Sequence, residues 1–172
     1  PLLPSNIMAN FFKRDQSLDE LKILVDTREQ QPLSFPREMK MKLDFGDYAI
    51  GAPHYDYTYV DRKSESDFKS TMSTGFERFK REIERAKKFS SFVFVVVESS
   101  IEQIIENNHF GPYQANLSYI WHNTRVLSHE YRDHCQFLFS GSRKMSEFLI
   151  PKILFHGKKI WQTDMQHFLD KL

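Results

Sequence analysis

The chain has 172 residues, of which 40% are hydrophobic and 27% are charged, a composition typical of one folded domain and not of a disordered segment. Its formal net charge of +1 excludes an overall basic field, so any affinity for nucleic acid must come from local basic clusters. The single cysteine, Cys135, excludes an internal disulfide, and no apolar stretch is long enough to cross a membrane. We therefore expect an intracellular protein of a reducing compartment, with no membrane partner.

The first part of the chain is predicted to be a leader followed by a strand. Residues 1–20 mix proline, asparagine, phenylalanine and charges without a clear period, which is typical of a leader. The β-rich run at residues 21–26 predicts a buried strand, with Asp26 and Arg28 on one face at its end and Glu29 in the following loop. These residues either form an ion pair that fixes the loop or border a functional site.

Two strands are predicted to form a hairpin. Pro32 and Pro36 indicate an irregular connection over residues 30–42, and strands then follow at residues 43–50 and 55–63. Three tyrosines share one face of the second strand: Tyr55, Tyr57 and Tyr59. Rings that cover a half-buried sheet are the simpler interpretation, and contact with DNA is the alternative.

The end of this hairpin gathers charged side chains. Because side chains alternate along a strand, Asp61 and Lys63 point to one face and Arg62 points to the other. Asp47 comes from the preceding strand, so pairing of the two strands would bring two carboxylates and an ammonium together. Mg²⁺ is commonly held by one or two carboxylates together with substrate phosphates, and a nearby lysine can orient the attacking water or stabilise negative charge. The group therefore fits metal-assisted hydrolysis of a phosphodiester.

Two helices are predicted after the hairpin. Ser64 and Asp67 have a spacing like that of a capping box, so Asp67 either caps a short helix or supports the site. Residues 76–88 have the strongest helical pattern, with one apolar stripe and one basic row. The basic row consists of Arg78, Arg81, Arg85 and Lys88. This row could bind DNA phosphates, whereas the interspersed glutamates favour an ordinary solvated face.

The remaining chain predicts an α/β domain. Residues 92–97 form a continuous apolar run, typical of a strand covered on both faces, and Glu98 is interpreted as ordinary strand-end polarity. The later elements are expected to be helices at 101–106 and 113–130, a strand at 136–139, and helices at 143–155 and 161–172. Helix follows strand twice in this part, which favours an α/β core. A single domain is expected over residues 21–157, with a C-terminal helical extension at 158–172.

Several short motifs, taken in order, resemble one enzyme family. The central pattern is Gly46-Asp47, a spacer, Asp61-Arg62-Lys63, three residues and Asp67. Around it lie residues 24–29, Ser64, and Gly75 with Arg78-Phe79 and Glu82, which resembles a Gly-Arg-Leu-x-x-Gln run. The chain thereby resembles the XPF/Hef-type structure-selective endonucleases, a branch of the PD-(D/E)XK nucleases. The resemblance covers residues 22–98 well and extends more loosely to residue 157.

The resemblance implies a restriction-endonuclease-like α/β fold, with a mixed central sheet flanked by helices. It also implies a Mg²⁺- or Mn²⁺-dependent endodeoxyribonuclease that acts on flaps, forks or junctions in repair, recombination or replication. Many members carry a helicase or a tandem helix-hairpin-helix module, and this chain has room for neither, so such a module is expected on a partner. Homodimers or heterodimers are implied as well, in the nucleus of a eukaryote or the cytoplasm of a prokaryotic or viral host cell.

The resemblance also assigns roles to individual residues. Asp47 and Asp61 are expected to ligate the metal, and Lys63 to position hydroxide or stabilise charge. The remaining candidates for support or phosphate contact are Asp26, Arg28, Glu29, Arg62 and Asp67.

One departure from the family pattern leaves alternatives open. The family usually has glutamate where this chain has Asp61, which shortens the side chain by one methylene. The site is therefore either active with a small adjustment or impaired, as in a pseudonuclease scaffold that binds branched DNA or a partner subunit. A third hypothesis is an endonuclease that reads the sequence of duplex DNA.

Overall fold

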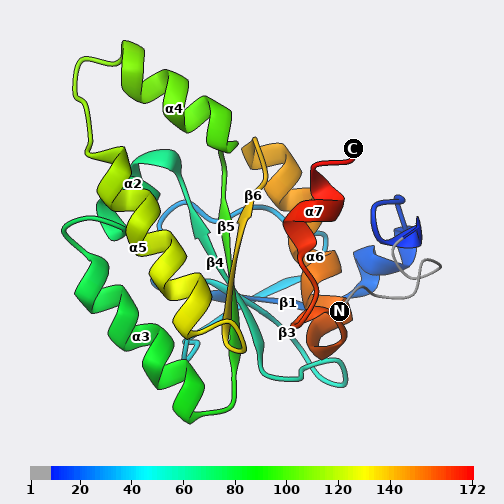
Figure 1. Cartoon of the computed structure of the whole chain (residues 1–172). Helices are drawn as coiled ribbons and strands as arrows, with labels where there is room; N and C mark the ends of the chain where they lie inside the picture. The colour runs from blue at the N-terminus through cyan, green and yellow to red at the C-terminus, as the bar shows by residue number, and fades with distance from the viewer. Residues whose placement is uncertain (1–8) are drawn as a thin grey trace.

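A six-stranded mixed sheet runs through the middle of the computed structural model, which describes residues 9–172 (Figure 1). The strands lie in the order β2-β1-β3-β4-β5-β6. Their bounds are β1 (Ile23–Asp26), β2 (Glu38–Met41), β3 (Tyr48–Ile50), β4 (Thr58–Lys63), β5 (Phe92–Val97) and β6 (Cys135–Phe139). β3 is antiparallel to β1 and β4, whereas the β1–β2, β4–β5 and β5–β6 pairs are parallel.

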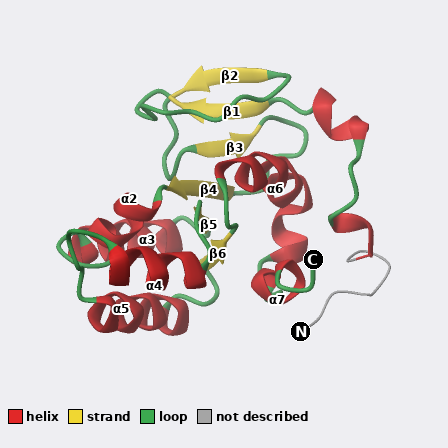
Figure 2. Ribbon diagram, turned by 90° about the horizontal axis from the view of Figure 1, so that it is seen from above, coloured by secondary structure: helices red, strands yellow, loops and turns green. Residues whose placement is uncertain are grey.

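Helices cover both faces of the sheet, as Figure 2 shows from above. On one face lie α2 (Glu65–Thr71), α3 (Phe76–Lys88), α4 (Ile101–Phe110) and α5 (Leu117–Glu130). On the other face lie α6 (Arg143–His156) and α7 (Met165–Leu169). The 3₁₀ turns η1 (Gln16–Glu20) and η2 (Gly157–Ile160) precede β1 and follow α6.

Each face of the sheet has its own hydrophobic core. In β5 every residue is buried, and Val93, Val95 and Val97 face the core under α2–α5. Phe92, Phe94 and Val96 face the core under α6. This two-sided burial explains the continuous apolar run in the sequence, because neither face of β5 reaches solvent. In α3, the predicted apolar stripe is buried: Phe76, Phe79, Ile83 and Ala86.

The hairpin is present, but its strands are shorter than predicted. The first strand was expected over residues 43–50, and β3 begins only at Tyr48, because Gly46 has a φ of 61° that breaks the extended backbone. The second was expected over residues 55–63, and β4 begins at Thr58, after Tyr57 with a φ of 71°. Alternation therefore cannot place the tyrosines before Thr58.

One strand was not predicted. β2 occupies residues 38–41, within the stretch expected to be an irregular connection. It pairs in parallel with β1 at the edge of the sheet, and all four of its residues are exposed. An edge strand with no buried face has no hydrophobic alternation, so the sequence contains no pattern from which to predict it. Pro36 is tolerated because it lies ahead of this edge strand.

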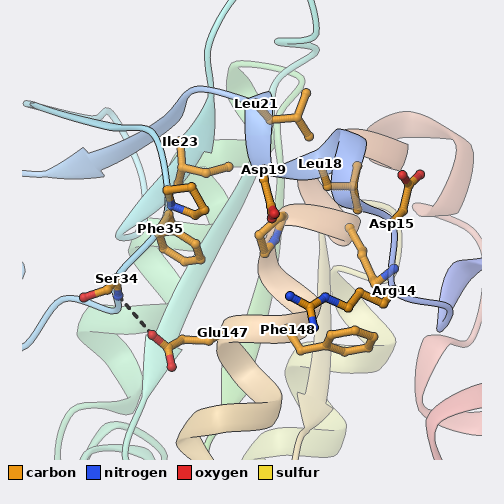
Figure 3. A pocket seen from close by; sticks show the side chains of 13 residues that line it. Arg14, Asp15, Leu18, Asp19, Leu21, Ile23, Ser34, Phe35, Glu147 and Phe148 are labelled. Carbon is orange, nitrogen blue, oxygen red and sulfur yellow. Dashed lines mark hydrogen bonds between the residues drawn. The ribbon is translucent and has the colours of Figure 1, made fainter.

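Residues 9–20, part of the predicted leader, pack against the domain, while residues 1–8 lie outside the described residues. Phe11 is 2% exposed and belongs to the core under α6. η1 and α6 also border a pocket of about 290 Å³ (Figure 3). At its rim the backbone N–H of Ser34 donates to the Glu147 carboxylate at 3.1 Å. This segment therefore shares the core of the domain.

The C-terminal part packs on β6 through a broken helix. One helix was predicted over residues 161–172, whereas within that range the structure has only the shorter α7. The Gln136 side chain donates to the carbonyl of Thr163 at 2.7 Å and accepts from the N–H of Met165 at 2.8 Å. At the start of β6, Cys135 is buried as predicted. Within residues 9–172, no helix combines the length and apolarity needed to cross a membrane.

Candidate active site

An open polar cleft of about 800 Å³ lies where β1 and β4 end and β3 begins, beside α2 and α3. Predicted site residues from the whole first half of the chain line it: Asp26, Arg28, Glu29, Asp47, Asp61, Arg62, Lys63 and Asp67. Ser64, Ser66, Ser70 and Thr71 add hydroxyl groups, and Glu82 adds a carboxylate. The fold thus gathers the predicted residues around one hollow.

Asp47 is positioned by the backbone of the neighbouring strand. The N–H of Arg62 donates to its carboxylate at 2.7 Å, and the N–H of Asp47 itself donates to the carbonyl of Val60 at 2.8 Å. Gly46 makes this close approach feasible: a Cβ there would lie 2.7 Å from the Val60 carbonyl oxygen. The Gly-Asp pair therefore brings the carboxylate onto β4 beside Asp61.

Asp61 and Lys63 lie on the same face of β4, as the alternation predicts. The Lys63 ammonium is 3.2 Å from the Asp61 carboxylate and 4.9 Å from the centre of the Phe79 ring. Burial lowers the pKa of Lys63, but the charge and hydrogen bond of Asp61 together with the charges of Asp47 and Glu82 hold that pKa above its ordinary value. Lys63 is therefore a cation beside the carboxylates.

The carboxylates crowd one another. Burial, and then the negative charges of Asp61 and Glu29, raise the pKa of Asp47 to about 8. A carboxyl group with this pKa is electrostatically unfavourable in its ionised form, even with Lys63 nearby. A bound cation would relieve the repulsion between Asp47 and Asp61.

Glu82 is a residue of the cleft that sequence reasoning did not include in the site. It projects from α3 and lines the cleft together with Asp61 and Lys63. Burial, and then the charge of Asp61, raise the pKa of Glu82. A signal was available, because Glu82 belongs to the run from Gly75 that resembles the family motif, and it is half-buried at the border of the apolar stripe of α3.

Arg62 faces away from the two acids and is held by other carboxylates. Its guanidinium lies 3.1 Å from Glu29 and 2.9 Å from Glu98, and its side chain is 5% exposed. Burial lowers the pKa of Arg62, but the hydrogen bonds to Glu29 and Glu98 hold it above its ordinary value. Glu98, interpreted as ordinary strand-end polarity, instead joins Arg62 to Arg143 at 3.4 Å. The ion pair between Arg62 and Glu29 thus stabilises the base of the cleft.

Asp26 and Arg28 form the ion pair that was one of two sequence interpretations. The Arg28 side chain donates to both carboxylate oxygens of Asp26, at 2.7 and 2.9 Å. The N–H of Leu43 donates to the same carboxylate at 2.7 Å. Burial raises the pKa of Asp26, but these hydrogen bonds outweigh it and leave that pKa below its ordinary value. Asp26 is therefore an ionised anchor for the loop, whereas Arg28 is 61% exposed toward solvent.

Asp67 lies on the exposed side of α2. The Ser64 hydroxyl accepts from the N–H of Asp67 at 3.2 Å, so Ser64 is the N-cap of this helix, and this is the only half of the expected capping box that the described structure has. Asp67 lines the rim of the cleft, in the first turn of the helix. Its negative charge is favourable there because the helix dipole is positive at this end.

The three arginines of α3 lie beside the cleft. Arg78, Arg81 and Arg85, together with Arg28, Asp44 and Glu82, line a hollow of about 310 Å³. Arg78 also borders a second hollow that contains Lys63. The basic row is therefore continuous with the site and not on a remote face.

The residues fit a hard divalent cation with few protein ligands. Asp47 and Asp61 offer oxygen ligands, and Mg²⁺ commonly uses one or two carboxylates and keeps several waters. Within residues 9–172, however, no three histidine, cysteine, aspartate or glutamate side chains are grouped to enclose a metal ion. The donor set is thus open, which suits an ion whose remaining ligands are water and substrate oxygens.

The structure is similar to solved structures of XPF from Aeropyrum pernix. For that protein in complex with DNA the TM-score is 0.57 at 20% identity, over 80% of this chain and 64% of that one. A second structure of it gives a TM-score of 0.57 at 19% identity, over 78% and 60%. This chain therefore spans less than two thirds of their length. No protein-family model and no curated protein matches the sequence. The predicted α/β fold with a mixed, helix-flanked sheet is confirmed, and it is shared with these XPF structures.

Proposed function

We propose that the protein is a metal-dependent DNA endonuclease of the XPF type. The observation that carries the proposal is the convergence of Asp47, Asp61 and Lys63 on one cleft, with the lysine 3.2 Å from one carboxylate. Two crowded acids beside a cation are the groups that hydrolysis of a phosphodiester needs. The XPF-type fold supports DNA as the substrate, because one of the two similar XPF structures is a complex with DNA.

In this proposal each residue of the cleft has a distinct task. Asp47 and Asp61 would hold Mg²⁺ or Mn²⁺, which when bound lowers the pKa of a coordinated water and neutralises charge on the phosphate. Lys63 donates to the attacking oxygen or to the phosphate oxygens as negative charge accumulates there. Arg62 keeps β4 in place through Glu29 and Glu98, so its contribution is structural.

We further propose that the substrate is branched DNA. The cleft is open and polar, and the arginines of α3 extend its positive surface along one side. A broad open cleft accommodates strands that diverge, and phosphate contacts through arginine fix their position without reading sequence. Because no helix-hairpin-helix element lies within residues 9–172, a partner or a second copy would supply further contacts.

A catalytically impaired scaffold is the second candidate. It is favoured by one observation, the shorter Asp61 in the position where the family usually has glutamate. Such a protein would bind branched DNA or a partner subunit without cutting. An endonuclease that reads duplex sequence is the third candidate, and it predicts discrete fragments from plain plasmid DNA.

Cleavage of end-labelled flap, fork and plain duplex DNA tests the proposal directly. The purified protein would be assayed in Mg²⁺, Mn²⁺ and EDTA, beside Asp61→Asn. We expect metal-dependent cutting near the branch that is lost in the variant. If folded protein cuts none of the three DNAs in either metal, the scaffold becomes the better interpretation.

A further inference from the structure

A second functional surface starts at the basic row of α3 and continues away from the cleft. Arg78, Arg85 and Phe89 are separated by seven and four residues, so they lie along one side of the helix and of its C-cap. From Arg78 to Phe89 this side is about 16 Å long. α3 begins beside α2 and ends at the loop that leads into β5 (Figure 1). The row of arginines therefore ends at an aromatic ring.

Phe89 is the first of a series of touching rings. Its centroid is 6.1 Å from that of Phe45, which is 5.3 Å from Tyr59. Tyr59 is 6.1 Å from Tyr55, and their hydroxyls share a hydrogen bond of 2.6 Å. Tyr55 is in turn 5.1 Å from Tyr57. The series thus connects the end of α3 with the turn before β4.

The inner and outer rings of this series have different surroundings. Phe45 and Tyr59 are 2% and 3% exposed and serve as packed supports. Tyr55, Tyr57 and Phe89 are 38%, 48% and 64% exposed, and we call these three rings the aromatic platform. Tyr59 is covered as the interpretation of sheet cover predicts, whereas Tyr55 and Tyr57, which lie before β4, leave much of their rings in solvent.

Cations lie at both ends of the series. The Arg85 guanidinium lies 4.8 Å from the centre of the Phe45 ring, and the Lys158 ammonium lies 5.4 Å from that of Tyr57. Two acidic residues lie near these cations. The backbone carbonyl of Asp44 accepts from Arg85, and the Asp56 carboxylate accepts from Thr58 and from the N–H of Lys158, so the Asp56 charge is already hydrogen-bonded.

We propose that the aromatic platform binds an unpaired DNA strand that leaves the cleft along α3. Exposed rings flanked by cations are an arrangement that holds single strands, because phosphates pair with the cations while bases stack on the rings. A paired duplex offers no free base faces to these rings. This inference rests on the proposed function and adds to it the surface on which an unpaired arm of the branched DNA lies.

Binding in EDTA tests the platform without cleavage. Fluorescence anisotropy would compare a fork that has one unpaired arm with a blunt duplex of the same paired sequence. We expect the wild type to prefer the fork, and Tyr57→Ala and Phe89→Ala each to weaken fork binding about tenfold. Neither change should affect binding of the blunt duplex. Phe89→Tyr should restore fork binding, because it restores a ring.

A matched control is Tyr113→Ala, which removes a ring that is 90% exposed and lies after α4, outside this series. It should leave fork binding unchanged. A 2-aminopurine placed in the unpaired arm gives an independent readout, since stacking should quench its fluorescence in the wild type and not in Phe89→Ala. Tyr57→Ala and Phe89→Ala alter exposed side chains, so we expect melting temperatures near that of the wild type, which would confirm that both variants fold.

The results separate this inference from the proposed function. Fork binding that Tyr57→Ala, Phe89→Ala and their double variant leave unchanged would overturn the platform, whether or not the enzyme cuts DNA. If the wild type never cuts DNA but Tyr57→Ala and Phe89→Ala lose the preference for the fork, the platform is supported and the nuclease function is rejected.

Discussion

The Asp47 carboxylate accepts a hydrogen bond from the backbone N–H of Arg62 at 2.7 Å. This bond holds Asp47, which precedes β3, against β4, the strand that carries the other acid, Asp61. The site therefore exists only when β3 and β4 pair in this register, which the Tyr48–Val60 pair sets. Because Asp61 adds a second charge nearby, the hairpin holds two acids at a cost in electrostatic energy.

The first prediction concerns metal binding. We expect millimolar Mg²⁺ to raise the melting temperature of the wild type, because an ion that binds only the folded state stabilises it. The isosteric variant Asp47→Asn should lose this shift and also lose cleavage, while its amide oxygen still accepts from Arg62. In EDTA above pH 8, where Asp47 is ionised, the variant should melt no lower than the wild type, since one of the two repelling charges is gone. An equal Mg²⁺ shift in both proteins would show that the ion binds elsewhere.

The second prediction concerns the length of the acid on β4. Asp61→Glu restores the carboxylate that the resembled family usually has, so we expect it to cut a labelled flap within about tenfold of the wild-type rate. Asp61→Asn keeps the shorter side chain without the charge and should be inactive. Inactivity of both would mean that the cleft is built around the shorter side chain.

The third prediction tests why glycine precedes Asp47. In Gly46→Ala the new Cβ would lie 2.7 Å from a backbone oxygen, at a φ of +61°, so we expect a loss of at least about 2 kcal/mol in the free energy of unfolding. Gly141→Ala is the matched control, because Gly141 has a φ of +89° and open space around it. It should cost about 1 kcal/mol, from the backbone conformation alone. Urea denaturation of both variants measures the difference, and equal losses would exclude the contact with β4.

The fourth prediction separates structure from chemistry at Arg62. Arg62→Ala leaves the buried Glu29 without its cation and Glu98 with Arg143 alone, which should lower the free energy of unfolding by about 3 to 5 kcal/mol. Arg81→Ala, at an exposed position of α3, should change it by less than about 0.5 kcal/mol. A fully stable Arg62→Ala that fails to cut DNA would instead place Arg62 in the chemistry.

The fifth prediction concerns the basic row. Replacing Arg78, Arg81 and Arg85 together by alanine should weaken DNA binding and lower the slope of log K against log salt by about two to three, because each phosphate contact contributes about 0.9. Lys80→Ala is the control on the same helix, since Lys80 pairs with Glu130 at 3.2 Å on another face. Its salt slope should equal that of the wild type. An unchanged salt slope in the arginine variant would show that DNA phosphates contact another part of the protein.

Most of the site could be predicted from sequence because it depends on local rules. Alternation along one strand was enough to place Asp61 with Lys63 and to turn Arg62 away. Glu82 and Glu98 were missed because their roles depend on which elements pack together: one projects from α3 into the cleft, and the other meets Arg62 across two parallel strands. The catalytic roles themselves stay predictions.

The elements of the fold were predictable where burial imposes a hydrophobic pattern on the sequence, and not where that pattern is absent. β5 and α3 were located closely because their buried faces give clear periods. β2 has no buried residue, and β4 starts late because of the backbone at Tyr57, which no periodicity records. Sequence reasoning therefore succeeded in the core and was weakest at the sheet edge and the hairpin turn.

The single thiol in β6 can report how often this part of the protein opens locally. Cys135 is 2% exposed, and burial raises the pKa of its thiol, so the native chain should react slowly with thiol-specific dyes. Labelling then requires β6 to separate from its surroundings, and the labelling rate measures how often this happens. Since no second cysteine competes, DNA and metal can be compared as protecting ligands in the unmodified sequence, with mass spectrometry counting a single adduct.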